Sequence, residues 1–403
     1  MDIVGRTAAP PPGGPAAGLF PRLPRAWFAV PAAAAASVAA VVATAVAITS
    51  GPHGHPAPGA AAGGAATAPP PRYAALARQG THGAASDRLR VLIRDTATGQ
   101  TLRTVDPPRP ANSFCDLSGT PDGRTFVAEA CTVTVTGPND AQTVTTSPGK
   151  FYRFTVDGRG KVGGLSPLSV PVPGGYDLDG AAVSPDGAVL AVASADHSHG
   201  FGRNPAISLY SMGTGQLLRS WTWHGQADII GRGAGADSLS WTADGTTIAF
   251  PLSVGKRDIG QVRLLSTAAP GRSLRSTSLV VNFGPTPSLQ MDTELSGPDS
   301  MITPDGSRIV ASTAEVSHRP TRTRLTVSEY SAATGARAAV LAAVTLHGNS
   351  VLYRTVLWSS PDGSKLIVGA PPGSRPGALI GVLTRDGFTP LPGGLDGITQ
   401  IVF

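Results

Sequence analysis

A four-residue turn motif recurs five times along the chain at nearly constant spacing. Each copy has Ser or Thr, then Pro or Ala, then Asp-Gly, and successive Asp residues are 64, 58, 61 and 57 positions apart. Pro presets φ at the first corner of a turn, Asp accepts hydrogen bonds from nearby backbone amides, and Gly tolerates the positive φ that closes a hairpin. The five copies are Thr120–Gly123, Ser184–Gly187, Thr242–Gly245, Thr303–Gly306 and Ser360–Gly363. Such periodicity predicts an array of similar structural units.

Short apolar or alternating segments flank these turns, as expected for the strands of hairpins. The segments that follow the five Gly residues are Thr125–Ala130, Val189–Ala193, Thr247–Phe250, Arg308–Ala311 and Lys365–Val368. A second turn occurs later in each unit, at Asp157-Gly158, Thr214-Gly215, Pro270-Gly271, Thr334-Gly335 and Asp386-Gly387, with further strand-like segments around it. Each unit therefore predicts two hairpins, or four strands.

These repeats resemble the bacterial WD40-like or TolB-type (PD40-like) β-propeller repeats, in which a Ser-Pro-Asp-Gly turn joins the two inner strands of a blade. The resemblance covers about Arg88 to Phe403 and implies an all-β propeller over residues 87–403. The strand-like segments Leu89–Arg94 and Thr101–Val105 resemble an outer half-blade, and Ile398–Phe403 resembles an inner strand. Joining them closes a ring of six blades, with seven as the alternative if one repeat interval contains an extra short blade. The Trp-Asp and Gly-His signatures of eukaryotic WD repeats are absent, so we infer no intracellular scaffolding role.

An uncharged apolar stretch precedes the repeats. The 23 residues from Trp27 to Thr49 are almost all apolar, and as a helix they would be about 34 Å long, enough to cross a bilayer. Basic residues precede this stretch, at Arg6, Arg22 and Arg25, and no charged residue follows before Arg72. The positive-inside rule therefore predicts a cytoplasmic N-terminus and an extracytoplasmic repeat domain.

We accordingly expect a short cytoplasmic arm (1–26), a signal-anchor transmembrane helix (27–49) and a Pro/Ala/Gly-rich linker (50–86) before the propeller. Two alternatives stay open. The segment Ala45-Val46-Ala47 resembles the cleavage site of a signal peptide, and cleavage after Ala47 would secrete the domain. A buried Ala-rich helix is the other interpretation of the same segment.

The chain has two cysteines, Cys115 and Cys131, placed symmetrically about Gly123 in the first turn. In a regular hairpin they would lie opposite each other on neighbouring strands, so we expect a disulfide. A disulfide agrees with an oxidising, exported location.

Charge and motif content narrow the functional classes. The chain has 32 Lys and Arg against 26 Asp and Glu, but only four are Lys and the Arg residues are scattered, so nucleic-acid binding is not predicted. A nucleophile elbow, a P-loop, a zinc-protease motif and a C-x-x-C pair are absent from the sequence, and no glycine pattern has the strand-and-helix context of a dinucleotide fingerprint. We therefore expect no cofactor and no identifiable catalytic residue.

Weak candidates for a metal or acid–base site lie in the second repeat. Asp196, His197 and His199 alternate in one segment, where the two imidazoles could point the same way, although a solvated loop is the favoured interpretation. Further polar residues could line the same or a neighbouring loop, namely Tyr176, Asp177, Asp179 and Asp228. Trp221 and Trp223 share one strand face, where packing between blades is favoured over stacking on a sugar. The repeated Asp residues are interpreted as turn formers.

The sequence thus predicts an extracytoplasmic, membrane-anchored propeller that acts as a binding or protein-interaction module. Its partner would be a protein, a peptide or a cell-envelope polymer that meets loops on one face of the ring. The alternative is an extracytoplasmic hydrolase or lyase with a site in the central channel. A sensor that signals through the cytoplasmic arm is a third interpretation, and the oligomeric state is not predicted.

Overall fold

The structure is a computed structural model, and the chain divides into two compact units, Met1–Ala43 and Thr44–Phe403. It describes residues 69–78, 89–136, 143–171, 177–196, 203–224, 227–228, 239–254, 259–271, 273–285, 293–318, 321–347, 356–361, 363–370, 379–384, 387–393 and 398–403. All of them belong to the second unit. The predicted arm, the predicted transmembrane helix and most of the predicted linker lie outside these residues. Within the described ranges, no helix has the length and apolar character needed to cross a membrane.

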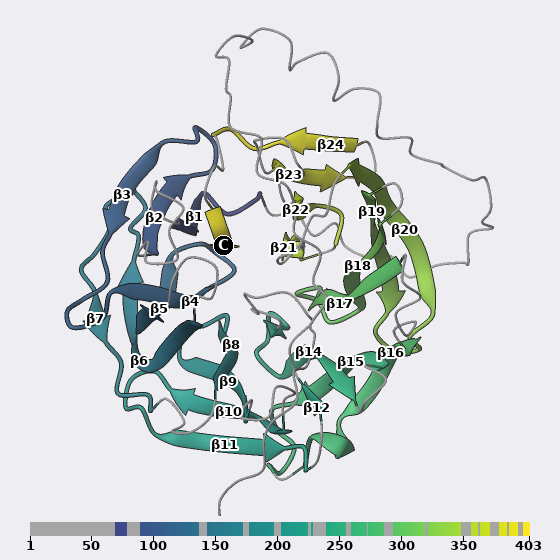
Figure 1. Cartoon of the computed structure of the whole chain (residues 1–403), viewed down its shortest axis with the longest axis horizontal. Helices are drawn as coiled ribbons and strands as arrows, with labels where there is room; N and C mark the ends of the chain where they lie inside the picture. Colours follow the sequence, from purple (N-terminus) through teal and green to yellow (C-terminus); the bar gives the residue numbers. More distant parts are fainter. Residues whose placement is uncertain are drawn as a thin grey trace, which may run out of the picture. The chain divides into compact units, whose positions relative to one another are not determined.

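Six antiparallel sheets are arranged around a common centre and form a six-bladed β-propeller, shown in Figure 1. From the centre outward, blade 1 contains β25 (Ile398–Val402), β1 (Tyr73–Arg78), β2 (Arg90–Asp95) and β3 (Thr101–Val105). Blade 2 contains β4 (Ser113–Gly119), β5 (Thr125–Thr136), β6 (Thr143–Thr155) and β7 (Ser166–Pro167). Blade 3 contains β8 (Asp177–Val183), β9 (Val189–Asp196), β10 (Arg203–Ser211) and β11 (Leu217–Thr222).

The remaining three blades follow the same order. In blade 4, β12 (Ala227–Asp228) and β13 (Ser240–Trp241) both pair with β14 (Thr247–Val254), followed by β15 (Ile259–Ser266) and β16 (Ser278–Pro285). Blade 5 contains β17 (Thr293–Ile302), β18 (Arg308–His318), β19 (Thr321–Ser331) and β20 (Arg337–His347). Blade 6 contains β21 (Val356–Ser359), β22 (Leu366–Ala370), β23 (Leu379–Thr384) and β24 (Gly387–Pro390). The prediction of six four-stranded blades is confirmed.

Blade 1 closes the ring with strands from distant parts of the chain. β25 pairs antiparallel with β1, with Ala75 opposite Val402 and Leu76 opposite Ile401. The sequence predicted the inner strand and the outer half of this blade, but it assigned β1 to the 50–86 linker, and that assignment is corrected here. β1 escapes the sequence pattern because five of its six side chains are buried, so it lacks the polar alternation of a half-exposed strand.

The recurring turn is held by the same hydrogen bonds in successive blades. In the turns that begin at Thr120, Ser184, Thr242 and Thr303, the hydroxyl donates to the Asp carboxylate at 2.6 Å. Each of these hydroxyls also accepts the backbone N–H five residues later. The five turn glycines have φ between 66° and 73°, which only glycine adopts without strain. In the fifth turn Ser360 accepts the N–H of Lys365 at 2.9 Å, and Asp362 lies outside the described residues.

The ring has two distinct faces. Neighbouring strands are antiparallel, so the Asp-Gly turn and the outer turn of a blade leave from the same end of its strands, which we call the turn face. The other connections leave from the opposite end, which we call the loop face. The first described residues enter the ring on the turn face: a Cβ placed on Gly123 would lie 2.6 Å from the carbonyl oxygen of Tyr73 and 3.0 Å from the Cβ of Pro71.

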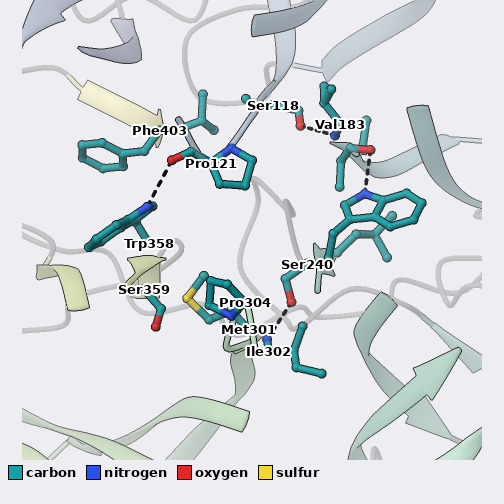
Figure 2. Close-up of a pocket in the computed structure, with 16 residues that line it drawn as sticks. Ser118, Pro121, Val183, Ser240, Met301, Ile302, Pro304, Trp358, Ser359 and Phe403 are labelled. Carbon is teal, nitrogen blue, oxygen red and sulfur yellow. Dashed lines mark hydrogen bonds between the residues drawn. The ribbon is translucent and has the colours of Figure 1, made fainter. Parts of the chain in front are cut away.

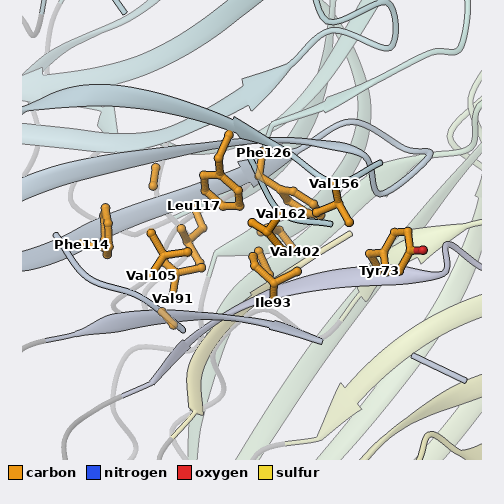
Figure 3. Packing of buried hydrophobic residues seen from close by; sticks show 14 of the residues in the cluster. Tyr73, Val91, Ile93, Val105, Phe114, Leu117, Phe126, Val156, Val162 and Val402 are labelled. Atoms are coloured by element: carbon orange, nitrogen blue, oxygen red, sulfur yellow. The ribbon is translucent and has the colours of Figure 1, made fainter. Parts of the chain in front are cut away.

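Apolar side chains fill the spaces between blades. Between blades 1 and 2, Phe126 and Phe154 stack with ring centroids 5.4 Å apart, and Tyr73, Ile93 and Val402 belong to the same cluster (Figure 3). Both sides of the inner strands are therefore buried, and stability depends on contact between neighbouring blades as well as on hydrogen bonding within each blade.

The turn hydrogen bonds give a first prediction. Thr303 is fully buried, and its hydroxyl links Asp305 to the backbone of Arg308. We expect Thr303→Ala to lower the free energy of unfolding by about 1–2 kcal/mol, because it removes the buried hydroxyl that joins the Asp305 carboxylate to the backbone N–H of Arg308. Thr303→Ser keeps the hydroxyl and should cost less than about 1 kcal/mol. Chemical denaturation measures both, and equal losses in the two variants would assign the effect to the methyl group instead.

Candidate functional site

A small cavity lies where the inner strands of all six blades converge on the turn face, and Figure 2 shows it from close by. Its volume is about 80 Å³, room for a few water molecules. The larger side chains in its wall are Trp241, Met301, Trp358 and Phe403, with Pro121 and Pro304 beside them. Ligand pockets of ordinary size begin at about 300 Å³, so this cavity is smaller than such pockets.

The polar groups of the wall link one blade to the next. Ser118 Oγ of blade 2 accepts the N–H of Val183 in blade 3 at 3.0 Å, and Ser240 Oγ of blade 4 accepts the N–H of Ile302 in blade 5 at 2.8 Å. The indole N–H of Trp241 donates to the carbonyl oxygen of Ala182 at 3.2 Å. These bonds leave a mostly apolar wall. Among the described residues that line this cavity there is no Asp, Glu, His, Lys, Arg or Cys.

Among these hydrogen bonds, the one formed by Trp358 joins the residues that are farthest apart in the sequence. Its indole N–H donates to the carbonyl oxygen of Pro121 at 3.2 Å, although the two residues are 237 positions apart. Blade 1 has no Asp-Gly turn at its centre, so the tryptophan of blade 6 meets the turn of blade 2 directly (Figure 2). This bond reinforces the ring at the point where strand pairing closes it.

We expect Trp358→Ala to lower the free energy of unfolding by about 3–5 kcal/mol, because a buried indole is removed from the wall. Trp358→Phe keeps most of the ring volume and loses the hydrogen bond, so its cost should be about 1–2 kcal/mol. Denaturant titration of both variants separates packing from hydrogen bonding. A loss below about 1 kcal/mol for Trp358→Ala would contradict a structural role for the residue.

Two acidic side chains are buried side by side in blade 2. Asp116 on β4 is opposite Glu129 on β5, and they are 7% and 5% exposed. Asp116 Oδ1 accepts a hydrogen bond from Gln400 Nε2 on β25 at 2.9 Å, and Glu129 Oε1 accepts the N–H of Gly149 at 3.2 Å. Burial, followed by the charge of Asp116, raises the pKa of Glu129 from 4.5 to about 7. The sequence interpretation missed this pair, although an acidic residue inside an apolar strand was a usable signal.

The raised pKa predicts that stability depends on pH. Since the folded state holds the Glu129 proton more tightly than the unfolded chain, the stabilisation is complete below about pH 4.5 and is lost as the pH rises through 7. A rise of this size corresponds to about 3 kcal/mol. Glu129→Gln should abolish this loss and be more stable than the parent at pH 8.

Denaturation curves between pH 4.5 and 8.5 test the dependence. Asp116→Asn is the matched variant, because removing the neighbouring charge should move the transition to lower pH without abolishing it. An unchanged pH profile in Glu129→Gln would show that another group titrates.

The candidate site residues named from the sequence lie in different parts of blades 2, 3 and 4, and some of them lie outside the described residues. Cys115 and Cys131 form a disulfide between β4 and β5, with their Cα atoms 5.9 Å apart. Asp196 ends β9, opposite Arg203 in the strand register, while Tyr176, His197 and His199 lie outside the described residues. The backbones of Asp177 and Asp228 belong to β8 and β12, and Asp179 is buried in β8. The described part of the chain contains no group of three His, Cys, Asp or Glu side chains suited to a metal ion.

Trp221, on β11, and Trp223, just after it, lie between blades 3 and 4. Trp221 is buried in the apolar cluster that these blades share. Trp223 has the guanidinium groups of Arg263 and Arg275 at 5.6 and 4.9 Å from its ring centroid. Arg275, in the 3₁₀ turn Leu274–Ser276, also donates to the carbonyl oxygen of His224 at 2.9 Å. The pair therefore packs between blades.

Comparisons with known proteins give distant structural similarities. The chain matches no protein-family model and no curated protein sequence. Its structure is similar to hydrazine synthase of Kuenenia stuttgartiensis, with 17% identity, a TM-score of 0.42, and coverage of 74% of this chain and 71% of the other. A putative 6-phosphogluconolactonase from Bacteroides uniformis has 13% identity, a TM-score of 0.41 and coverage of 82% and 98%.

The Dos1 propeller has 12% identity, a TM-score of 0.38 and coverage of 80% of this chain and 91% of the other. The described residues form a six-bladed β-propeller.

Proposed function

We propose that the chain is a membrane-tethered, extracytoplasmic β-propeller that binds a protein, a peptide or an envelope polymer through its loop face. The observation that carries this proposal is the side on which the chain enters the ring. Pro71 and Tyr73 pack against Gly123 on the turn face, so a tether that precedes them arrives on that face. The loop face is then the side turned away from the tether and open to a partner.

The turns and connections of the two faces also favour the loop face as the binding surface. The turn face carries short turns whose Asp carboxylates and hydroxyls bond to each other and to their own backbone. The loop face carries the connections from one blade to the next, such as residues 106–112 between β3 and β4. It also carries an extension of blade 2, in which Thr132–Thr136 of β5 pair with residues of β6 beyond the last pair of β4 with β5. Binding loops on a rigid scaffold are a common basis of recognition.

Export is supported by the disulfide between Cys115 and Cys131, because such bonds persist mainly in oxidising compartments. The basic residues before the apolar stretch 27–49 favour the same topology. For the alternative of a hydrolase or lyase in the central channel, the described residues offer no support, since the cavity wall is apolar and the Asp116–Glu129 pair is enclosed between strands.

Lysine labelling tests the topology. All four lysines lie in the repeat region, at Lys150, Lys161, Lys256 and Lys365. We expect a membrane-impermeant amine reagent to label the lysine side chains of the full chain in intact spheroplasts as strongly as after lysis. Labelling that needs lysis would put the propeller inside the cell.

Photo-crosslinking tests which face binds the partner. A crosslinking amino acid is placed at Arg109 or Thr134 on the loop face, and at Ala243 on the turn face as the control, since all three side chains are exposed. We expect crosslinked adducts in cells from the two loop-face positions and none from Ala243. Adducts from Ala243 alone would reverse the choice of face.

A further inference from the structure

Five exposed basic side chains surround the point where the chain enters the ring. Arg72 precedes β1, Arg103 is on β3, and the others belong to turns of blade 2. We call this group the basic corner; it consists of Arg72, Arg103, Arg124, Arg159 and Lys161.

Contacts on one turn, residues 157–163, bring these side chains together. Arg103 Nη1 donates to the carbonyl oxygen of Val162 at 2.9 Å, and a Cβ placed on Gly158 would lie 3.5 Å from Arg124 Nη1. The hydroxyl of Tyr73 donates to the carbonyl oxygen of Gly158 at 3.4 Å, and the guanidinium of Arg72 lies 5.3 Å from the centroid of the Tyr73 ring. The basic corner is therefore one surface at the junction of blades 1 and 2.

Three acidic residues share this surface, and each is bonded to nearby backbone N–H groups. Asp95 accepts hydrogen bonds from Arg72 Nε and from the N–H groups of Ala97 and Thr98. Asp122 accepts the N–H of Arg124, and Asp157 accepts the N–H groups of Arg159 and Lys161. Five positive and three negative charges leave a net charge of +2, with the basic groups exposed to solvent.

The Asp-Gly turns of the next two blades lack the basic residue that follows the turn of blade 2. The Asp-Gly turns of blades 3 and 4 are Ser184–Gly187 and Thr242–Gly245, followed by Ala188 and Thr246 in place of Arg124. Their acidic residues are Asp186 and Asp244, and neither turn contains Lys or Arg. The junction of blades 3 and 4 also has exposed arginines, Arg219 and Arg275, and Arg219 Nη1 donates to the carbonyl oxygens of Thr267 and Ala269. What sets the basic corner apart is its place, at the point where the chain enters the ring.

We propose that the basic corner docks on the anionic lipid headgroups of the membrane that holds the tether. This inference rests on the proposed function, because it takes the apolar stretch 27–49 as the anchor. The 19 residues from Ser50 to Ala68 can span no more than about 70 Å, so the corner stays within reach of the bilayer surface. Exposed Lys and Arg near an anionic surface are attracted to it over about one Debye length. Docking there directs the loop face away from the membrane.

The test uses the full chain in vesicles of phosphatidylcholine alone or with about 30% phosphatidylglycerol, at low and high salt. Gly164 is exposed and a Cβ there meets no atom within 4 Å, so Gly164→Cys provides a labelling site beside the corner. Energy transfer from this dye to a headgroup-labelled lipid measures docking. The native cysteines are paired and do not compete for the label.

We expect energy transfer to rise with phosphatidylglycerol and to fall when salt is raised to about 0.5 M, where charges are screened within a few ångströms. Neutralising two charges in the variant Arg159→Gln/Lys161→Gln should lower the ratio of docked to undocked protein about 25-fold, at about five-fold per charge. Arg109→Gln, an exposed position on the loop face, is the matched control and should leave docking unchanged.

Each outcome separates docking from tethering. Flotation of the chain with phosphatidylcholine vesicles at high salt shows that the anchor is inserted in the bilayer. If the chain floats but its energy transfer does not depend on phosphatidylglycerol, the docking proposal is overturned and the anchor is not. If the chain does not float with phosphatidylcholine vesicles, the proposed membrane anchor is wrong. Docking is then still supported if the chain floats with vesicles that contain phosphatidylglycerol and if the variant Arg159→Gln/Lys161→Gln does not. If the chain floats with neither kind of vesicle, the docking proposal is overturned as well. Loss of binding to soluble polyglutamate in that variant, without any lipid effect, would assign the corner to an acidic polymer and overturn the lipid proposal.

Discussion

The pairing of β25 with β1 is the interaction on which the ring depends. Tyr73, Ala75 and Ala77 of β1 pack toward blade 2, while Ala74 and Leu76 pack toward blade 6. One strand thus completes the apolar clusters on both of its sides, and it does so through contacts between residues more than three hundred positions apart. Five blades alone would leave these two clusters open to water, which is why a six-residue strand has so large an effect on the whole domain.

Local chemistry explains why most of the fold was predictable. The Asp-Gly turns require Gly at positive φ and a hydroxyl five residues before the N–H that it accepts, so their residues are legible in the sequence. β1 was not predictable in this way, because its burial comes from blades 2 and 6 rather than from its own pattern. A strand buried on both sides between neighbouring blades has no periodic signal that separates it from an Ala-rich linker.

The central cavity could not be predicted from the sequence for a related reason. Trp358 and Pro121 meet only once the ring is closed, and the bond between Ser118 and Val183 crosses from one blade to the next. The buried pair of Asp116 and Glu129 was in principle visible, since both residues interrupt apolar strands. Only the structure shows that they are opposite each other and that Gln400 of the closing strand donates to one of them.

The two faces of the ring differ in how many of their polar side chains already form hydrogen bonds within the fold. On the turn face, carboxylates and hydroxyls bond to their own turns, and the centre is filled by Trp241, Trp358 and Phe403. Groups committed to the fold in this way cannot be exchanged for new specificity without loss of stability. The basic side chains at the junction of blades 1 and 2 extend beyond those turns, so they can meet a charged surface while the turns stay intact. Under the proposed function, recognition of a partner falls to the loop face, whose connections can vary in length without disturbing the hydrogen bonds that hold the blades together.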